Sequence, residues 1–413
     1  MRASHLAGCT LVVVSACFFN PHYGPGTACP TGQCPSGLTC NTQTMLCELG
    51  VPDAPGAPDA PVAADDGSAS EKICLGDLIH VCIDPPASPS VLPTQLDTSS
   101  SPLCLLSNVD ACVIAVSEAP IVSMVVSGRR PLILLSTRSL TVSGTIDVSS
   151  KLGKAPGPGA DVGPCSSDAT PPTVGEFPDG GGGWGGSFGD AGGSGGAGMS
   201  PTNAKGGFGG TAPSAIDPGN TLRGGCPGGA GAGRGGGNSG GEPGGAVLLV
   251  AATTLTIAET GSVNASGAGG GGGGGDGMAG GAGGGSGGMI MLDAATIVIS
   301  GQCFANGGGG GQGGTNLPEE PGSPGGESTA PLVGGAGGTS SSVGGAGGAG
   351  GSAGNPLAAG QPGGVDPLPP QQLGGGGGGG GSVGVIKIPA FASLMSVAAN
   401  VSPTPRRTSA RGR

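Results

Sequence analysis

The sequence predicts an all-β fold, a short parallel β-helix-like solenoid of about three to four coils with long glycine-rich loop insertions, preceded by a small disulfide-rich module. Three observations predict it. A unit of short aliphatic segments recurs along the chain, these segments alternate with period two, and most of the 98 glycines among 413 residues interrupt the unit at the same point. Glycine placed in this way indicates insertions at one corner of a repeating scaffold, and the absence of a strict Gly-X-Y period excludes collagen.

The N-terminus, residues 1–16, has the features of a secretory signal peptide. Arg2 precedes the apolar stretch Leu6–Val14, and small residues lead to Cys17. The sequence Val14–Cys17 resembles a bacterial lipobox, so Cys17 is the expected lipidation site and the membrane is an expected partner through the lipid. Ordinary cleavage beside an incidental cysteine is the alternative. We expect an exported protein anchored at the outer membrane or cell surface, because no other segment is long and apolar enough to span a bilayer.

Thirteen cysteines fit an oxidising compartment. Residues 17–50 are expected to hold the lipid anchor and a four-cysteine module too small to have a hydrophobic core, in which two disulfides allow three connectivities. Zinc is the competing explanation, but the module has no Cys-x-x-Cys pair. Cys303 is left over and is expected to be a buried thiol. The disulfide candidates are Cys29, Cys34, Cys40, Cys47, Cys74, Cys82, Cys104, Cys112, Cys165 and Cys226.

Three further regions flank or precede the repeats. Residues 51–72 are rich in Pro, Asp and Ala and are expected to be a semi-extended linker. Residues 73–130 are expected to be a cysteine-containing N-terminal cap with the first strands, and residues 391–413 a disordered tail. The net charge of −11 argues against nucleic acid as a partner.

The repeats are expected over residues 131–390, and each complete copy supplies three strand-like segments. A β-sandwich or a set of unrelated hairpins is the alternative, because short apolar runs do not specify topology. The copies comprise Leu132–Leu135, Leu140–Val142 and Thr145–Ser149; Val247–Val250, Leu255–Ile257 and Ser262–Ser266; Met289–Leu292, Ile297–Ile299 and Gln302–Asn306; and an incomplete fourth at Val383–Ile388.

Alignment of the copies predicts which side chains stack. Leu140, Leu255 and Ile297 should lie in one sheet, and alternation along the third strands separates an inward set from an outward set. The inward columns are Ile146, Val263 and Cys303, then Val148, Ala265 and Ala305; the outward column is Asp147, Asn264 and Phe304.

The insertions occupy residues 151–245, 267–288 and 307–381, each after a third strand. Glycine-rich loops of this kind are either disordered, because glycine has the largest backbone entropy to lose, or packed in polyproline-II-like layers that glycine alone permits. We expect partly ordered loops, with Trp184 among the aromatic residues that could hold the first one to the scaffold.

No catalytic or metal-binding constellation stands out, and we expect no enzyme activity, cofactor or metal. Only Asp147 is acidic in the outward column, whereas polysaccharide-cleaving β-helices need several carboxylates. His80 is the only histidine outside the N-terminal region, and it lies in the expected cap. The stretch Gly271–Met278 fits one copy of a calcium-binding nonapeptide, but such repeats bind calcium only in tandem.

Several segments resemble a group of glycine-rich surface lipoproteins from myxobacteria: Arg130–Leu134, Ser143–Ser150, Leu222–Cys226 and Gly288–Ala294. Together with the lipobox, the cysteine module and the linker, the resemblance covers nearly the whole chain. It implies a surface location and a β-repeat fold, and it implies no activity and no residue role.

These features predict a non-catalytic, lipid-anchored cell-envelope protein, structural or adhesive, that displays glycine-rich loops on a β-solenoid. Polysaccharide or other envelope components are the expected partners besides the membrane. A carbohydrate-active β-helix enzyme, a polysaccharide lyase or hydrolase with an unrecognised site, is the main alternative, and a phage-fibre-like recognition tip is a third.

Overall fold

The computed structural model describes Cys34, residues 38–41 and 46–49, and residues 72–409 with gaps at 85–91, 117, 119, 161–162, 177–178, 201–205, 234–237, 275–277, 317–319, 340–342, 355–364, 367–371 and 397–399. The chain forms two compact units, Met1–Ser68 and Ala69–Arg413. In the first unit, β1 (Leu38–Asn41) pairs antiparallel with β2 (Leu46–Leu49), and a disulfide joins Cys34 to Cys47.

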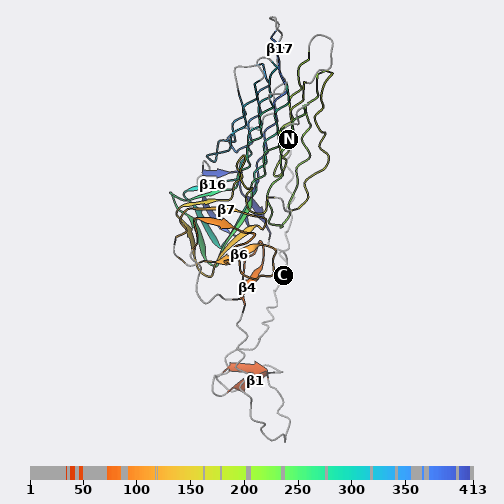
Figure 1. Ribbon diagram of the computed structural model, residues 1–413. Coiled ribbons are helices and arrows are strands. Elements are labelled where there is room, and N and C mark those ends of the chain that lie inside the picture. The colour runs from red at the N-terminus through yellow and green to blue at the C-terminus, as the bar shows by residue number, and fades with distance from the viewer. Residues whose placement is uncertain are drawn as a thin grey trace, which may run out of the picture. The chain divides into compact units, whose positions relative to one another are not determined.

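The second unit is built from three parallel sheets, and its described residues contain no α-helix (Figure 1). Sheet I contains β5 (Gln95–Asp97), β7 (Met124–Ser127), β10 (Thr145–Asp147), β13 (Ser262–Asn264), β16 (Gln302–Phe304) and β21 (Val401–Ser402). Sheet II contains β6 (Cys112–Ala115), β8 (Leu132–Ser136), β11 (Ala246–Ala251), β14 (Met289–Asp293), β19 (Val385–Pro389) and β22 (Arg406–Thr408). Sheet III contains β9 (Leu140–Val142), β12 (Thr254–Ile257), β15 (Thr296–Ile299) and β20 (Ser393–Ser396).

From β7 onward the chain visits sheets II, III and I in turn, an order compatible with a β-solenoid. The predicted stacking is confirmed: Leu255 pairs in register with Leu140 on one side and Ile297 on the other. The column through Ile146, Val263 and Cys303 is also in register, and all three side chains are fully buried. The inward side chains of the three sheets form one hydrophobic core.

Sheet II is buried on both faces. Every residue of β8, β11 and β14 is buried, whereas strands of sheet III such as β12 alternate. A strand that is covered on both faces has apolar side chains at every position and not at alternate ones. This explains why the first segment of each copy is a continuous apolar run. The outer face packs against the hairpin of β3 (Ile73–Leu75) and β4 (Val81–Ile83) and against Phe188 and Leu222 of the first insertion.

The hairpin, expected as a cap, lies across the strands of this outer face. Its turn is held by Asp293 at the end of β14, whose Oδ2 accepts hydrogen bonds of 2.7 Å from the backbone N–H groups of both Asp77 and Leu78. Asp293 is only 2% exposed, and this burial raises the pKa of its carboxyl group.

The expectation of a disordered tail from residue 391 is wrong for its described strands. β20 pairs with β15, β21 with β16 and β22 with β19, so paired strands continue beyond residue 391. Arg407 donates hydrogen bonds to the carbonyl groups of Ala390 and Ala392, and Arg406 to that of Gly189. These strands are short and mostly polar, which concealed them in the sequence: β22 has no buried residue, and in β20 only Leu394 packs against the core.

The glycine tracts leave the parallel sheets between sheet I and sheet II and run side by side away from them (Figure 1). Backbone hydrogen bonds join tracts from different insertions every third residue. The N–H groups of Gly183 and Gly186 donate to the carbonyl oxygens of Gly281 and Gly284, whose own N–H groups donate to those of Gly376 and Gly379, each at 2.9 Å. A three-residue period is that of polyproline II, which has no internal hydrogen bonds and must find partners in its neighbours. We call this body the glycine array.

A separate short hairpin, β17 (Val365–Asp366) with β18 (Gln372–Leu373), lies within the third insertion.

Close approach of the backbones makes individual glycines necessary. A Cβ atom at Gly272 would overlap the carbonyl group of Gly322 in the third insertion, whereas a Cβ at Gly274, in the same glycine run, would meet nothing within 4 Å. We therefore expect Gly272→Ala to destabilise the protein by about 1–3 kcal/mol, the usual cost of overpacking. Gly274→Ala is the matched control and should leave the free energy of unfolding unchanged or slightly raised. Denaturant unfolding of both variants measures this, and equal stabilities would refute a close-packed array.

Asp293 predicts a pH dependence of stability. In the folded state the pKa of the Asp293 carboxyl lies above its ordinary value of 3.8, so the folded state binds the carboxyl proton more tightly than the unfolded state does. The free energy of unfolding should therefore fall as pH rises from about 3.8 through the raised pKa. Asp293→Asn keeps an oxygen for both N–H groups and should remove this part of the decline. Asp293→Ala leaves two donors unpaired, at about 1–3 kcal/mol each. Unfolding free energies measured from acid to neutral pH test this; a constant difference between wild type and Asp293→Asn would contradict it.

Candidate functional site: a polar groove on sheet I

The outer face of sheet I carries a groove of about 400 Å³. Its floor crosses three neighbouring strands, β10, β13 and β16, and its walls come from a turn and from the third insertion. The described lining residues are Thr145, Glu259, Thr260, Gly261, Ser262, Asn264, Gln302, Phe304 and Thr329.

Strand register sets the floor. Thr145, Ser262 and Gln302 form one row across the three strands, and Asn264 lies beside Phe304 in the next outward row. These positions face outward because the residues between them, such as Val263 and Cys303, point into the core. The predicted outward placement of Asn264 and Phe304 is therefore confirmed. Phe304 is nevertheless only 3% exposed, although it lines the groove together with Thr329.

One wall is a longer turn in the second copy. The turn from sheet III to sheet I contains Ser143 and Gly144 in the first copy, Ser300 and Gly301 in the third, but residues 258–261 in the second. The hydroxyl of Thr260 donates a 2.8 Å hydrogen bond to the carbonyl oxygen of Ser143, which fixes the turn against the neighbouring copy. Glu259, beside it, is exposed.

The opposite wall is Thr329, held through its neighbours. The Asn306 amide nitrogen donates hydrogen bonds of 2.9 Å to the Ser328 hydroxyl and the Ala330 carbonyl. The Ser328 hydroxyl in turn donates a 2.7 Å bond to the carbonyl of Val333. Because Asn306 lies two residues after the end of β16, this network ties the wall to the floor.

Hydroxyl and amide groups dominate the lining, and Glu259 is the single carboxylate among its described members. Asp147, the acidic residue of the outward column, is engaged elsewhere: Lys151 lies 2.8 Å from one carboxylate oxygen, and the Ser149 hydroxyl bonds to the other. Paired-carboxylate hydrolysis needs two carboxyl groups flanking one bond. The described lining supplies hydrogen bonding to a ligand but not such a pair.

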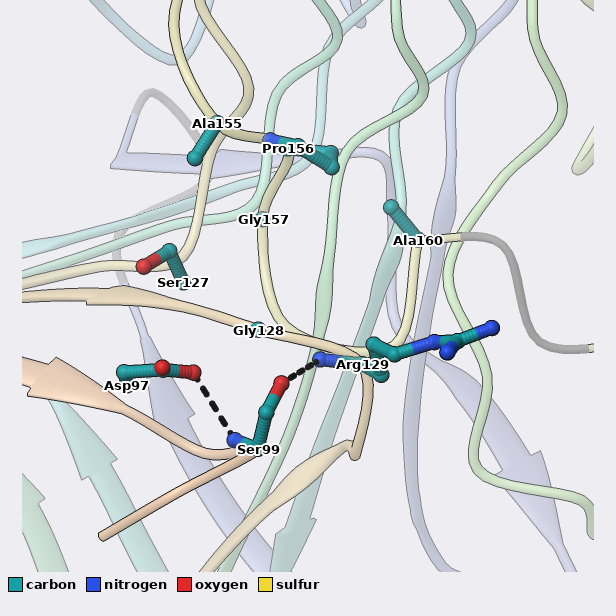
Figure 2. A pocket seen from close by; sticks show the side chains of 9 residues that line it. All are labelled: Asp97, Ser99, Ser127, Gly128, Arg129, Ala155, Pro156, Gly157 and Ala160. Carbon is teal, nitrogen blue, oxygen red and sulfur yellow. Dashed lines mark hydrogen bonds between the residues drawn. The ribbon is translucent and has the colours of Figure 1, made fainter.

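A second crevice, of about 280 Å³, lies at the other end of sheet I (Figure 2). Its carboxylate, Asp97, accepts 2.8 Å hydrogen bonds from the Ser99 N–H and the Ser100 hydroxyl, which lower its pKa. The Arg129 N–H donates to the Ser99 hydroxyl oxygen at 2.8 Å. These bonds close a local turn, so the carboxylate has a structural role there.

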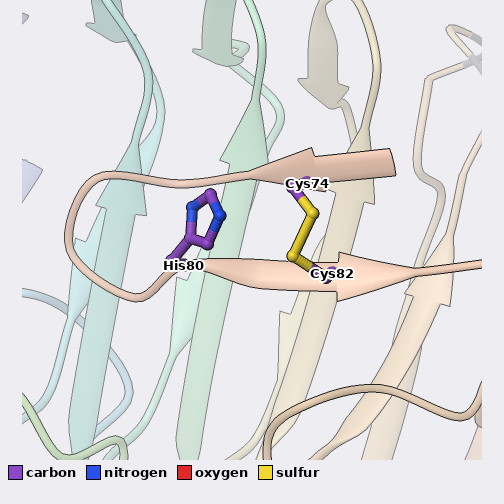
Figure 3. A group of neighbouring side chains, drawn as sticks. All are labelled: Cys74, His80 and Cys82. Carbon is purple, nitrogen blue, oxygen red and sulfur yellow. A yellow bond between two sulfur atoms is a disulfide. The ribbon is translucent and has the colours of Figure 1, made fainter. Parts of the chain in front are cut away.

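His80 lies beside Cys74 and Cys82 on the β3–β4 hairpin, close enough for the three side chains to share a metal ion (Figure 3). The two sulfur atoms are bonded to each other, however, so they are not thiolate ligands in this structure. The hairpin is therefore cross-linked, with an exposed histidine next to the bridge.

The structure resolves much of the cysteine pairing that the sequence left open. Disulfides join Cys34 to Cys47, Cys74 to Cys82, Cys104 to Cys112 and Cys165 to Cys226. Cys40 is also disulfide-bonded, whereas Cys29 and the expected lipidation site Cys17 lie outside the described residues.

Sequence reasoning missed Glu259, Gln302 and Thr329 as groove residues. The extra length of the second turn was a usable signal for Glu259. Thr329 carried none, because its place depends on how the third insertion folds back. Among the described residues, no helix is long and apolar enough to cross a membrane.

No family model, curated protein or solved structure matches the chain.

Cys303 is the free cysteine of the described residues, and its complete burial raises its pKa to about 12. Iodoacetamide reacts with the thiolate form of cysteine. It should therefore not modify Cys303 in the native protein near neutral pH, and it should modify Cys303 fully in the denatured protein. Mass spectrometry of the peptide containing Cys303 measures this site alone. Modification of the native protein at the denatured rate would contradict its burial.

Proposed function

We propose that this chain is a non-catalytic, lipid-anchored protein of the cell envelope, structural or adhesive in role, in which a solenoid of three to four coils displays the glycine array. The observation that carries the proposal is the set of backbone hydrogen bonds joining glycine tracts from all three insertions. Tracts joined in this way form a stiff body. A stiff body that is held away from a membrane anchor suits an adhesive role, in which it contacts other envelope components, or a structural one.

Two features of the chain support an anchored arrangement. The lipobox-like sequence ending at Cys17 provides the attachment, and the linker at residues 51–72 provides distance from the membrane. Disulfides in both compact units suit an exported protein, because such bonds persist in oxidising environments.

The groove favours binding over catalysis in this proposal. Its described lining offers hydroxyl and amide groups with one carboxylate, the type of surface that forms hydrogen bonds with envelope polysaccharides. A lyase or hydrolase would require a second acid or base in the same place.

Two measurements on the full chain test the proposal. Labelling of the producing cells with a lipid precursor should mark the wild-type protein and not Cys17→Ala. Purified protein in detergent should cosediment with insoluble envelope polysaccharide and release no soluble sugar. Equal labelling of both proteins would remove the anchor, absence of cosedimentation would remove the adhesive role, and release of sugar would favour the polysaccharide lyase or hydrolase.

A further inference from the structure

We propose that the groove on sheet I is a binding site for an uncharged, hydroxyl-rich saccharide segment. The inference rests on the adhesive role proposed above and assigns it a location and a ligand class. It follows from the chemistry of the lining, from its charge and from its shape.

The lining matches a polyol in its hydrogen-bonding groups. Gln302 is exposed and carries both a donor and an acceptor, and the hydroxyl groups of Ser262 and Thr329 do the same. Sugar hydroxyls both donate and accept, so they suit side chains of this mixed character. Phe304 lies beneath these groups and is only 3% exposed, so the polar side chains supply nearly all of the surface that a ligand can contact.

The charge of the lining disfavours acidic ligands. Glu259 carries the only charge among the described lining residues, and no arginine or lysine joins it. The nearby Lys151 is paired with Asp147 at 2.8 Å. A uronate, sulfate or phosphate group entering the groove would face Glu259 without a compensating cation, which disfavours it.

The shape of the groove fits a segment of a chain rather than a single small molecule. The row Thr145, Ser262 and Gln302 crosses three parallel strands, and adjacent strands lie about 4.8 Å apart. The row therefore presents equivalent polar positions over about 10 Å. The walls at Glu259 and Thr329 bound this row, so the groove has a defined direction.

Titration calorimetry of the full chain in detergent tests the assignment with hexamers of glucose, N-acetylglucosamine and galacturonic acid as probes. We expect at least one neutral hexamer to bind and the galacturonate hexamer to bind at least tenfold more weakly. Gln302→Ala should weaken neutral binding about tenfold, and Glu259→Gln should reduce the discrimination against galacturonate. Gln95→Ala, an exposed glutamine on β5 of the same sheet outside the groove, is the matched control and should bind as wild type does.

The outcomes separate this inference from the adhesive role. Cosedimentation with insoluble polysaccharide together with unchanged hexamer affinity in Gln302→Ala would overturn the groove and leave adhesion intact. Preference for galacturonate, or absence of binding to every hexamer, would also overturn the groove. Loss of cosedimentation in the wild-type chain would overturn both. All three substituted side chains are exposed, so the thermal unfolding of each variant should match wild type, which verifies that the fold is kept.

Discussion

In-register parallel pairing between successive copies is the constraint on which the rest of the molecule depends. The ladder of Leu140, Leu255, Ile297 and Leu394 fixes sheet III, and the ladder of Ile146, Val263 and Cys303 fixes sheet I. Because side chains alternate with period two, a shift of one residue would turn each buried column outward. The same register aligns the chain exits after β10, β13 and β16, so the three insertions begin as neighbours. The groove floor is another product of this register, since its rows are the outward counterpart of the buried columns.

The glycine array shows how segments with almost no side chains can be ordered. Glycine loses more conformational entropy on folding than any other residue, and these tracts have little apolar area to compensate. Their backbone groups, however, pair between insertions with regular spacing, as in the bonds from Gly308, Gly311 and Gly314 to Gly285, Ala282 and Ala279. The absence of Cβ atoms allows the backbones to approach this closely. Stability in this part of the molecule therefore resides in the main chain, whereas in the three parallel sheets it resides in aliphatic side chains.

Much of the scaffold was predictable from the sequence because its information is local. The three segments of each copy, their register and the position of the insertions follow from alternation and repetition, and the pairing of Leu255 with Leu140 and Ile297 agrees with them. What failed depends on distant contacts. The strands at Ser393–Ser396 and Arg406–Thr408 are too polar to stand out, and the hairpin that covers sheet II is held by Asp293, more than 200 residues away. The groove was only partly foreseeable, since Asn264 and Phe304 follow from register but Thr329 does not.

The period of the glycine array restricts how its length can change. Donors recur every third residue, as at Gly180, Gly183 and Gly186, and each meets an acceptor in a tract from another insertion. Removing one residue from a tract would rotate the following backbone by a third of a turn and direct its N–H groups away from their acceptors. Removing three would restore the phase and shorten the tract by one turn. Insertions and deletions in these tracts should therefore be tolerated mainly in multiples of three residues. The geometry of the backbone thus restricts a sequence whose composition alone sets no such limit.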